Sequence, residues 1–298
     1  MALPKHTELH YRIWHYFYLT ICGAVFFFLI APLFAIIPIS FSVSPFMVFT
    51  EGMLAWPPDP EAWSIRWYRN MIGDCSADVV SSTVPCSTKW MKGTVNSFYI
   101  GIIATVIATA LGTLAALGLS RPHMPYKGLI MAILISPMIV PLIITAAGMF
   151  FFYARISLVY TFTGVILAHV ALATPFVVIT VTATLVGFDM NMVKAAQSLG
   201  AKPMRTFFKV IMPLILPGII SGALFAFITS FDEVVIVMFM ASIDQLTIPK
   251  QMWAGIRQEI SPVILCMATC LVLLSIFLLT TVELLRRRSE KLRGIKAR

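Results

Sequence analysis

The chain has 298 residues, of which 59% are hydrophobic and only 12% are charged, and its formal net charge is +9 at pH 7. Soluble domains carry roughly twice this share of charged residues, so the composition excludes an ordinary water-soluble globular protein, and the high hydrophobic content excludes a disordered chain. A protein that crosses a membrane several times fits the composition, and the positive charge then indicates either a membrane surface or nucleic acid.

Six apolar stretches are long enough to cross a bilayer, because a membrane-spanning helix needs about 20 mostly apolar residues. They contain glycine and proline, which membrane helices tolerate and which allow close packing and bending. The first stretch is too long for the apolar core of a signal peptide, so we expect a retained helix. We predict an all-α polytopic membrane protein with six transmembrane helices at residues 14–37, 94–119, 128–153, 161–186, 214–241 and 262–285.

An even number of spans places both termini on one side of the membrane, and the distribution of Lys and Arg selects that side. Fifteen of the 22 basic residues fall on the side of the termini, and the other seven fall on the opposite side. We therefore predict that the tails at 1–13 and 286–298 are cytoplasmic. The positive charge is then a signal for orientation at the lipid membrane, which argues against nucleic-acid binding.

The loop at 38–93 is the longest stretch outside the predicted spans, and we expect it to be external. Its Trp and Tyr residues suit the headgroup region of a membrane, and they could also form a docking surface for an external partner. Cys75 and Cys86 lie in this loop and could form a disulfide if that side is oxidising. No Cys/His cluster in the sequence has the spacing of a metal site.

The connection at 187–213 has an unusual pattern. Asp189 is a good helix N-cap, residues 190–199 fit a helix of about three turns, and Gly200 stands where a left-handed C-cap would fall. Pro203 can open a second helix at its first turn. On pattern alone, this cytoplasmic elbow is either an ordinary interfacial connection or a knob that inserts into a cytoplasmic partner. Its apolar stripe would consist of Met192, Ala195, Ala196 and Leu199.

Residues 194–218 read KAAQSLGAKPMRTFFKVIMPLILPG and resemble the EAA loop of the permease subunits of ABC importers. The matching positions are Ala195, Ala196, Gly200, Val210 and Pro213. In that family the elbow is the coupling helix, which docks in a groove of the ATPase subunit. Lys194 stands where the family usually has Glu, and this reversal of charge affects any ion pair that Glu would make, not the elbow itself. The resemblance assigns ATPase coupling to Asp189, Lys194, Ala195, Ala196, Leu199, Gly200 and Arg205.

Other stretches extend the resemblance over residues 94–285, the predicted five-helix core. Asn96–Gly101 opens the second span as in these permeases. Three more stretches look like the spermidine/putrescine branch, namely Leu167–Asp189, Ala226–Met240 and Leu246–Ser275. Related permeases carry other small solutes, including opines and aminophosphonates, and these substrates remain the alternative.

The resemblance implies the type I ABC importer permease fold and a location in the bacterial inner membrane. It implies import by alternating access, driven by ATP and Mg on a separate ATPase dimer. A periplasmic binding protein would deliver the small-molecule substrate. A second permease chain, related but not identical, would complete the membrane core.

Asp232 and Glu233 are the acidic residues well inside a predicted span, whereas Glu283 stands at the cytoplasmic end of the last one. A charge at the bilayer centre costs about 2.5–3.5 kcal/mol on insertion scales, so such a residue normally faces a cavity or a partner. In one interpretation the acids attract a cationic substrate such as a polyamine, and Phe231 offers an aromatic face. In the other they form a structural hydrogen-bond anchor or a gate. Adjacent helix positions point about 100° apart, so the two acids could divide these roles.

The sequence contains no GxxxxGK[ST] phosphate loop and no HExxH or GxSxG motif. We therefore expect no enzymatic activity and no cofactor in this chain, with ATP hydrolysis on another subunit. A stand-alone channel or secondary transporter is the alternative from a different class. The inverted repeats that many secondary carriers contain are not apparent in the sequence.

Overall fold

A computed structural model describes residues 8–76, 79, 88–121, 123–187, 189, 191–258 and 261–292. Within these residues there are helices, turns and irregular segments, one isolated β-bridge between Ser42 and Trp63, and no strand. The prediction of an all-α protein is confirmed for this part of the chain. The ends of the predicted tails, residues 188 and 190 of the elbow, and Cys86 lie outside the described residues.

The chain divides into two compact units, which we describe separately. The first comprises Met1–Ser87 with Glu259–Ser275, and the second comprises Thr88–Gln258 with Ile276–Arg298. The last helix, α13 (Val263–Leu292), therefore contributes its first half to one unit and its second half to the other.

The first unit opens with the long helix α1 (Leu9–Ile39), which contains the first predicted span and has no buried residue. An apolar helix without a buried residue is suited to a lipid environment. The loop that follows contains three short helices, α2 (Glu51–Leu54), the 3₁₀ helix η1 (Pro60–Ala62) and α3 (Arg66–Met71).

A buried tryptophan folds this loop back onto the end of α1. Trp67 is completely buried, and its indole Nε1 donates to the carbonyl oxygen of Ser42 at 2.8 Å. Next to it, the Tyr68 hydroxyl lies 2.7 Å from Ser40 Oγ. Buried indole and phenol groups need such polar partners, so these bonds allow α3 to pack against the chain that follows α1.

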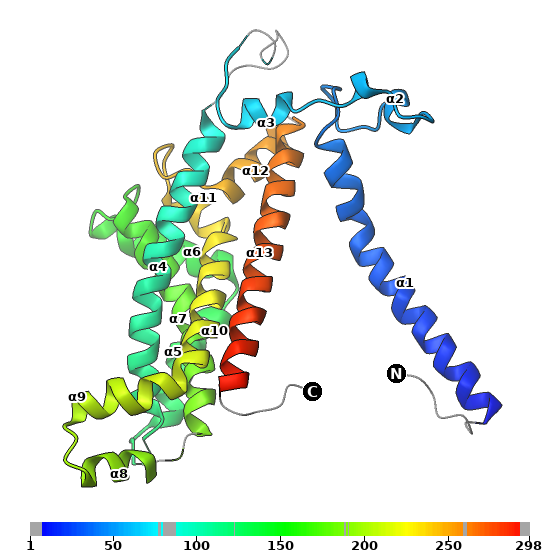
Figure 1. Cartoon of the computed structure of the whole chain (residues 1–298). Coiled ribbons are helices and arrows are strands. Elements are labelled where there is room, and N and C mark those ends of the chain that lie inside the picture. The colour runs from blue at the N-terminus through cyan, green and yellow to red at the C-terminus, as the bar shows by residue number, and fades with distance from the viewer. Residues whose placement is uncertain are drawn as a thin grey trace. The chain divides into compact units, whose positions relative to one another are not determined.

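The second unit is built around three helices that pack against one another, α4 (Lys89–Leu119), α7 (Phe162–Val186) and α10 (Met212–Phe231) (Figure 1). The remaining elements are α5 (Lys127–Ile139), α6 (Leu142–Arg155), α8 (Asn191–Ser198), α9 (Pro203–Thr206), the π-helical turn η2 (Phe207–Ile211), α11 (Val235–Met240) and α12 (Ile248–Gln258).

Glycines let α4 and α10 approach α7 closely. A Cβ added at Gly112 of α4 would collide with the side chain of Val177, and one added at Gly218 of α10 would collide with the side chain of Thr184. Both of these partners lie on α7. Small residues have this role in membrane bundles, where close packing replaces the hydrophobic effect as the force between helices.

Five described helices are long and apolar enough to cross a membrane, and a bent pair makes the sixth candidate. The bent pair is α5 with α6, which meet at an angle of 102° in place of the continuous helix predicted at 128–153. Pro141 explains the break, because proline has no N–H to donate and disfavours helical geometry in the preceding residue. Val140 is accordingly extended, with φ −71° and ψ 135°.

The predicted helix at 214–241 is wrong in its extent. Helical structure runs without interruption from Pro203 to Phe231, stops at the two acidic residues, and resumes as α11. The run of apolar residues continues through the break, which is why hydropathy did not reveal it. The side chain of Glu233 supplies the physical reason, since it bonds to the backbone at the start of α11.

Candidate functional site

The break after α10 separates the environments of the two acids. Asp232 is the C-cap of α10, and its backbone N–H donates to the carbonyl oxygen of Ile228 at 3.0 Å. Glu233 is only 7% exposed, and its Oε1 accepts the backbone N–H of Ile236 at 2.9 Å. The Glu233 carboxylate thus lies at the positive end of α11, where a negative charge is stabilised by the helix dipole.

Asp232, in contrast, is exposed. It lies on a cavity of about 360 Å³ that is lined by Leu142, Ile228, Thr229, Asp232, Glu233, Val234 and Val235. The lining is mostly apolar, and the Glu233 carboxylate in it is already engaged by the backbone. Asp232 therefore offers the accessible carboxylate of this cavity, and its surroundings suit a group that is both cationic and partly apolar.

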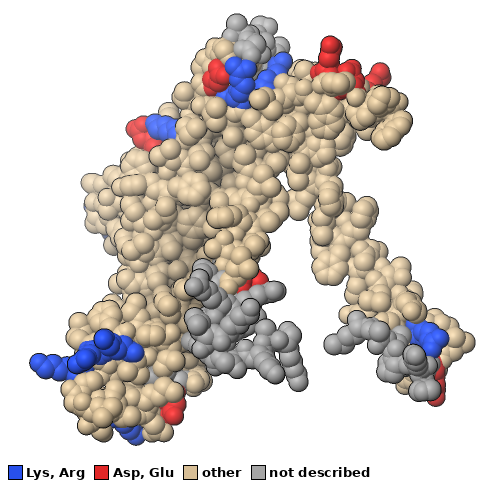
Figure 2. Space-filling view, in the orientation of Figure 1, with Lys and Arg blue, Asp and Glu red and all other residues tan. Residues whose placement is uncertain are grey.

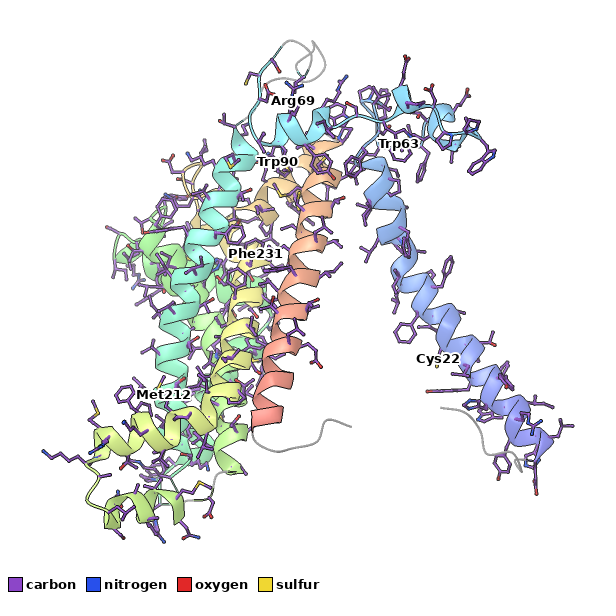
Figure 3. All side chains as sticks on the ribbon, viewed as in Figure 1. Cys22, Trp63, Arg69, Trp90, Met212 and Phe231 are labelled. Carbon is purple, nitrogen blue, oxygen red and sulfur yellow. The ribbon has the colours of Figure 1, made fainter. Side chains whose placement is uncertain are left out.

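The structure does not bring Phe231 into this cavity. Its ring lies 5.2 Å from Phe98 of α4 and 5.3 Å from Phe227 of α10, measured between ring centroids, so it belongs to an aromatic cluster between these helices (Figure 3). Close by, His169 of α7 is buried, and its Nδ1 lies 2.8 Å from Ser230 Oγ. These contacts hold the end of α10 against α4 and α7 and so position the Asp232 cavity.

A charged residue outside the lining of this cavity, Lys250 of α12, bonds to the far end of α11. Its Nζ donates to the carbonyl oxygen of Ala241 at 2.8 Å and to that of Val237 at 3.3 Å. These carbonyls lie at the negative end of α11. Burial lowers the pKa of this ammonium group. Lysine near the C-terminus of a helix is a recognisable pattern, but Lys250 belongs to the next helix, so no local pattern predicts this contact.

The predicted elbow forms a helix, a turn and a second helix. The Asp189 carboxylate accepts the backbone N–H of Asn191 at 2.9 Å, and α8 ends at Ser198, one residue earlier than predicted. Gly200 has a φ of +79°. The N–H groups of Gly200 and Ala201 donate to the carbonyls of Gln197 and Ala196, which is the Schellman pattern of a helix ended by glycine. Pro203 opens α9.

The elbow surface combines exposed apolar and basic side chains. Leu199 is 89% exposed, which is costly for an apolar residue in water unless another surface covers it. Basic side chains stand at the end of the second unit formed by α8 and α9, among a surface that is mostly uncharged (Figure 2). The exposed apolar side chains are Met192, Leu199, Met204 and Phe208, and the exposed basic ones are Lys194, Lys202, Arg205 and Lys209.

Comparison with known protein families shows which family the chain belongs to. The model of the family described as "binding-protein-dependent transport system inner membrane component" matches residues 108–291, which is more than half of the sequence. The chain belongs to this family. It is therefore a permease of a binding-protein-dependent ABC importer, and its apolar helices make it a multi-pass inner-membrane protein.

Two relatives of the permease carry names from one branch. The spermidine/putrescine transport system permease protein PotC of Haemophilus influenzae is 29% identical over 200 residues, which are 67% of this chain and 78% of the relative. The putrescine transport system permease protein PotI of Escherichia coli is 29% identical over 252 residues, which are 82% of this chain and 81% of the relative. The resemblance to the spermidine/putrescine permeases is therefore confirmed.

A solved structure shares the fold of the permease. It is a chain of a bacterial ABC transporter involved in the import of the acidic polysaccharide alginate, with a TM-score of 0.69 that covers 96% of this chain and 99% of that one. The two sequences are only 14% identical, so the likeness concerns the fold alone. Membership of the family implies an ATP-driven ATPase partner, a substrate-binding protein and a second permease.

The predicted disulfide of the permease is described in part. Cys75 is disulfide-bonded, whereas Cys86 lies outside the described residues, so the pairing of these two stays a prediction. Near Cys75, Arg69 Nε lies 2.8 Å from Asp74 Oδ2, and Asp74 Oδ1 accepts from the Ser76 hydroxyl at 2.7 Å. These bonds to Ser76 and Arg69 lower the pKa of Asp74. Among the described residues no group of His, Cys, Asp and Glu could hold a metal ion.

Proposed function

We propose that the permease imports a polyamine or a similar small cation, and that Asp232 is the carboxylate that attracts this cation in the pathway. The observation that supports the proposal is the difference between the two acids. Glu233 is buried and bonded to the backbone, while Asp232 is exposed at a largely apolar cavity. An extended polycation with methylene segments needs such a combination of a charge and apolar walls. The names of the relatives support the same substrate class.

In this proposal the elbow is the coupling helix. The exposed Leu199 and its apolar neighbours would enter a groove of an ATPase dimer, and the basic residues Lys194 and Arg205 would face that partner. The rigid turn at Gly200 would let the elbow transmit motion to α10, which follows it directly. ATP and Mg would be bound by the ATPase, so that this chain contributes no hydrolytic chemistry.

The remaining parts of the proposal concern topology and assembly. Both termini would be cytoplasmic, because they lie on the same side as the elbow and most of the basic residues, and the elbow would face the ATPase in the cytoplasm. A related but non-identical permease would complete the pathway, and a periplasmic binding protein would deliver the substrate. Alternating access would open the Asp232 cavity to the two sides in turn. Co-isolation of the chain with an ATPase would exclude a stand-alone channel.

The test is to neutralise the two acids separately. We expect Asp232→Asn to lower the uptake of radiolabelled spermidine or putrescine by about tenfold or more, since it removes the charge that attracts the cation. Glu233→Gln is the matched control. It removes the neighbouring charge but keeps an oxygen that can accept the N–H of Ile236, so we expect uptake within about threefold of the parent.

Both variants are compared at equal membrane level, with binding of the polyamine to the isolated binding protein measured in parallel. Normal uptake by Asp232→Asn would contradict the role of this carboxylate. Absence of polyamine binding to the cognate binding protein would contradict the substrate class, whatever the variants do.

A further inference from the structure

The short helix α11 forms part of the wall of the Asp232 cavity. Its first residue, Val235, lines the cavity together with Val234, while Ile236, Val237 and Met240 are completely buried. The helix has six residues and packs against α6 and α7. A helix of this length is not stable by its own hydrogen bonds, so its position depends on this packing and on the groups that bond to its ends.

Side chains of opposite charge hold the two ends. The Glu233 carboxylate accepts the N–H of Ile236 at the positive end, and the Lys250 ammonium donates to the carbonyls of Ala241 and Val237 at the negative end. Each charge matches the sign that the helix dipole requires at its position. The carbonyl of Met240 also accepts the backbone N–H of Tyr160 at 2.9 Å.

The start of α12, the helix that contains Lys250, is bonded to α4. Asn96 of α4 donates its Nδ2 hydrogens to the carbonyls of Asp244 at 2.7 Å and Leu246 at 2.9 Å. Ser97 Oγ accepts the N–H of Ile248, the first residue of α12, at 2.9 Å. The ammonium group of Lys250 thus extends to α11 from a helix whose start is bonded to the core of the unit.

We infer that Lys250 is a positioning residue which, together with Glu233, fixes α11 and thereby the wall of the cavity where Asp232 is exposed. A half-buried ammonium group is expensive to desolvate, and a side chain such as methionine would fill the same space without that cost. The bonds from Lys250 instead place two specific carbonyls. The consequence for transport rests on the proposed function, whereas the position of α11 does not.

The experiment uses the full chain in its native transporter, with Cys22, Cys266 and Cys270 replaced by Ala and a single cysteine introduced by Thr229→Cys at the cavity. A positively charged thiol reagent then reports how open the cavity is. We expect Lys250→Met to change the labelling rate of this cysteine by about threefold or more and to lower polyamine uptake by about tenfold. Lys250→Arg keeps the cation and its donors, so labelling and uptake should both stay within about twofold of the parent.

Arg257→Met is the matched control. Arg257 is an exposed cation on the same helix, and among the described residues the structure shows no bond from it to α11. It should leave labelling unchanged. If Lys250→Met does not reach the membrane, Lys250→Leu replaces it, because Leu likewise has no charge and no group that can donate to the two carbonyls.

Two results would overturn the inference. One is an unchanged labelling rate in the Lys250 variant, even if its thermal stability falls. The other is equal effects of Lys250→Met and Arg257→Met. Labelling needs no substrate, so it measures the position of α11 even if the parent transporter does not import polyamines. That failure would contradict the proposed function alone.

Discussion

The two ends of the second unit differ in how their side chains are used. At the end formed by α8 and α9, apolar side chains such as Leu199 are exposed among basic residues. At the end that carries α12, side chains of α4 bond to the backbone of the loop at 241–248, and Lys250 bonds to the end of α11. These ends lie apart along the helices of the unit (Figure 1).

This difference separates an elbow whose order comes from its own turn from an end whose order comes from bonds between elements far apart in the chain. Both ends also expose apolar side chains, Leu199 at the elbow and Ile243 at the α12 end. Buried backbone groups at the α12 end are satisfied by the unit's own side chains, so that end can keep its shape while other parts move. The elbow is ordered internally by its Schellman turn, but its apolar surface is left for another protein to cover. The proposed coupling role of the elbow and the proposed substrate role of the Asp232 cavity would place these two demands on a single chain.

The largest effect is expected from the turn of the elbow. Gly200→Val places a β-branched residue at a φ of +79°, a conformation that costs an L-residue about 1–2 kcal/mol or more. A Cβ at this position would meet nothing within 4 Å, so the effect is conformational and not steric. We expect at least tenfold less co-isolated ATPase and uptake, measured on detergent-extracted transporter and in membrane vesicles.

Gly200→Asn is the control for this change, because asparagine tolerates left-handed geometry. It should retain most of the uptake and of the ATPase. If Gly200→Val also retained both, the elbow would not need its shape, and the contrast between the two ends would lose its functional meaning.

A smaller effect is expected at the α12 end. Asn96 is buried and donates to two carbonyls, so Asn96→Ala leaves both without their partner and should cost about 1–3 kcal/mol of stability. Thermal unfolding of the purified transporter measures this loss. Thr94→Ala on the same helix removes only a bond to the carbonyl of Trp90 within α4 and should cost much less. Equal losses in the two variants would show that the loop is not held by Asn96.

The sequence predicts some of these features for clear physical reasons. The long apolar helices follow from hydropathy and length, and the turn at Gly200 follows from a glycine placed after a helical pattern and before proline. The kink at Val140 follows from Pro141, because proline disfavours helical geometry in the residue before it. The continuous apolar run at 128–153 concealed this kink. These features depend on residues that are close together in the chain.

The missed features depend on contacts between distant residues. The break at Asp232 and Glu233 lies within an apolar run, and its cause is a side chain bonded to the next helix. Lys250 bonds to carbonyls of a different helix, and Asn96 bonds to a loop that follows it by well over a hundred residues. Phe231 was expected beside the substrate, yet its neighbours in the aromatic cluster come from α4 and α10. Periodicity and composition contain no information on such pairs.

The smallest effect is expected from the ion pair at the surface of the α12 end. Lys92 Nζ lies 2.8 Å from Asp244 Oδ1, and the two side chains are 45% and 76% exposed. Exposed pairs of this kind contribute about 0.2–1 kcal/mol and are weakened by salt. A double-mutant cycle with Lys92→Met and Asp244→Asn, followed by thermal unfolding at low and high salt, should give a coupling energy below about 1 kcal/mol that falls as salt rises. A coupling larger than the loss in Asn96→Ala, and insensitive to salt, would mean that charge at the surface holds the loop in place of the buried bonds from α4.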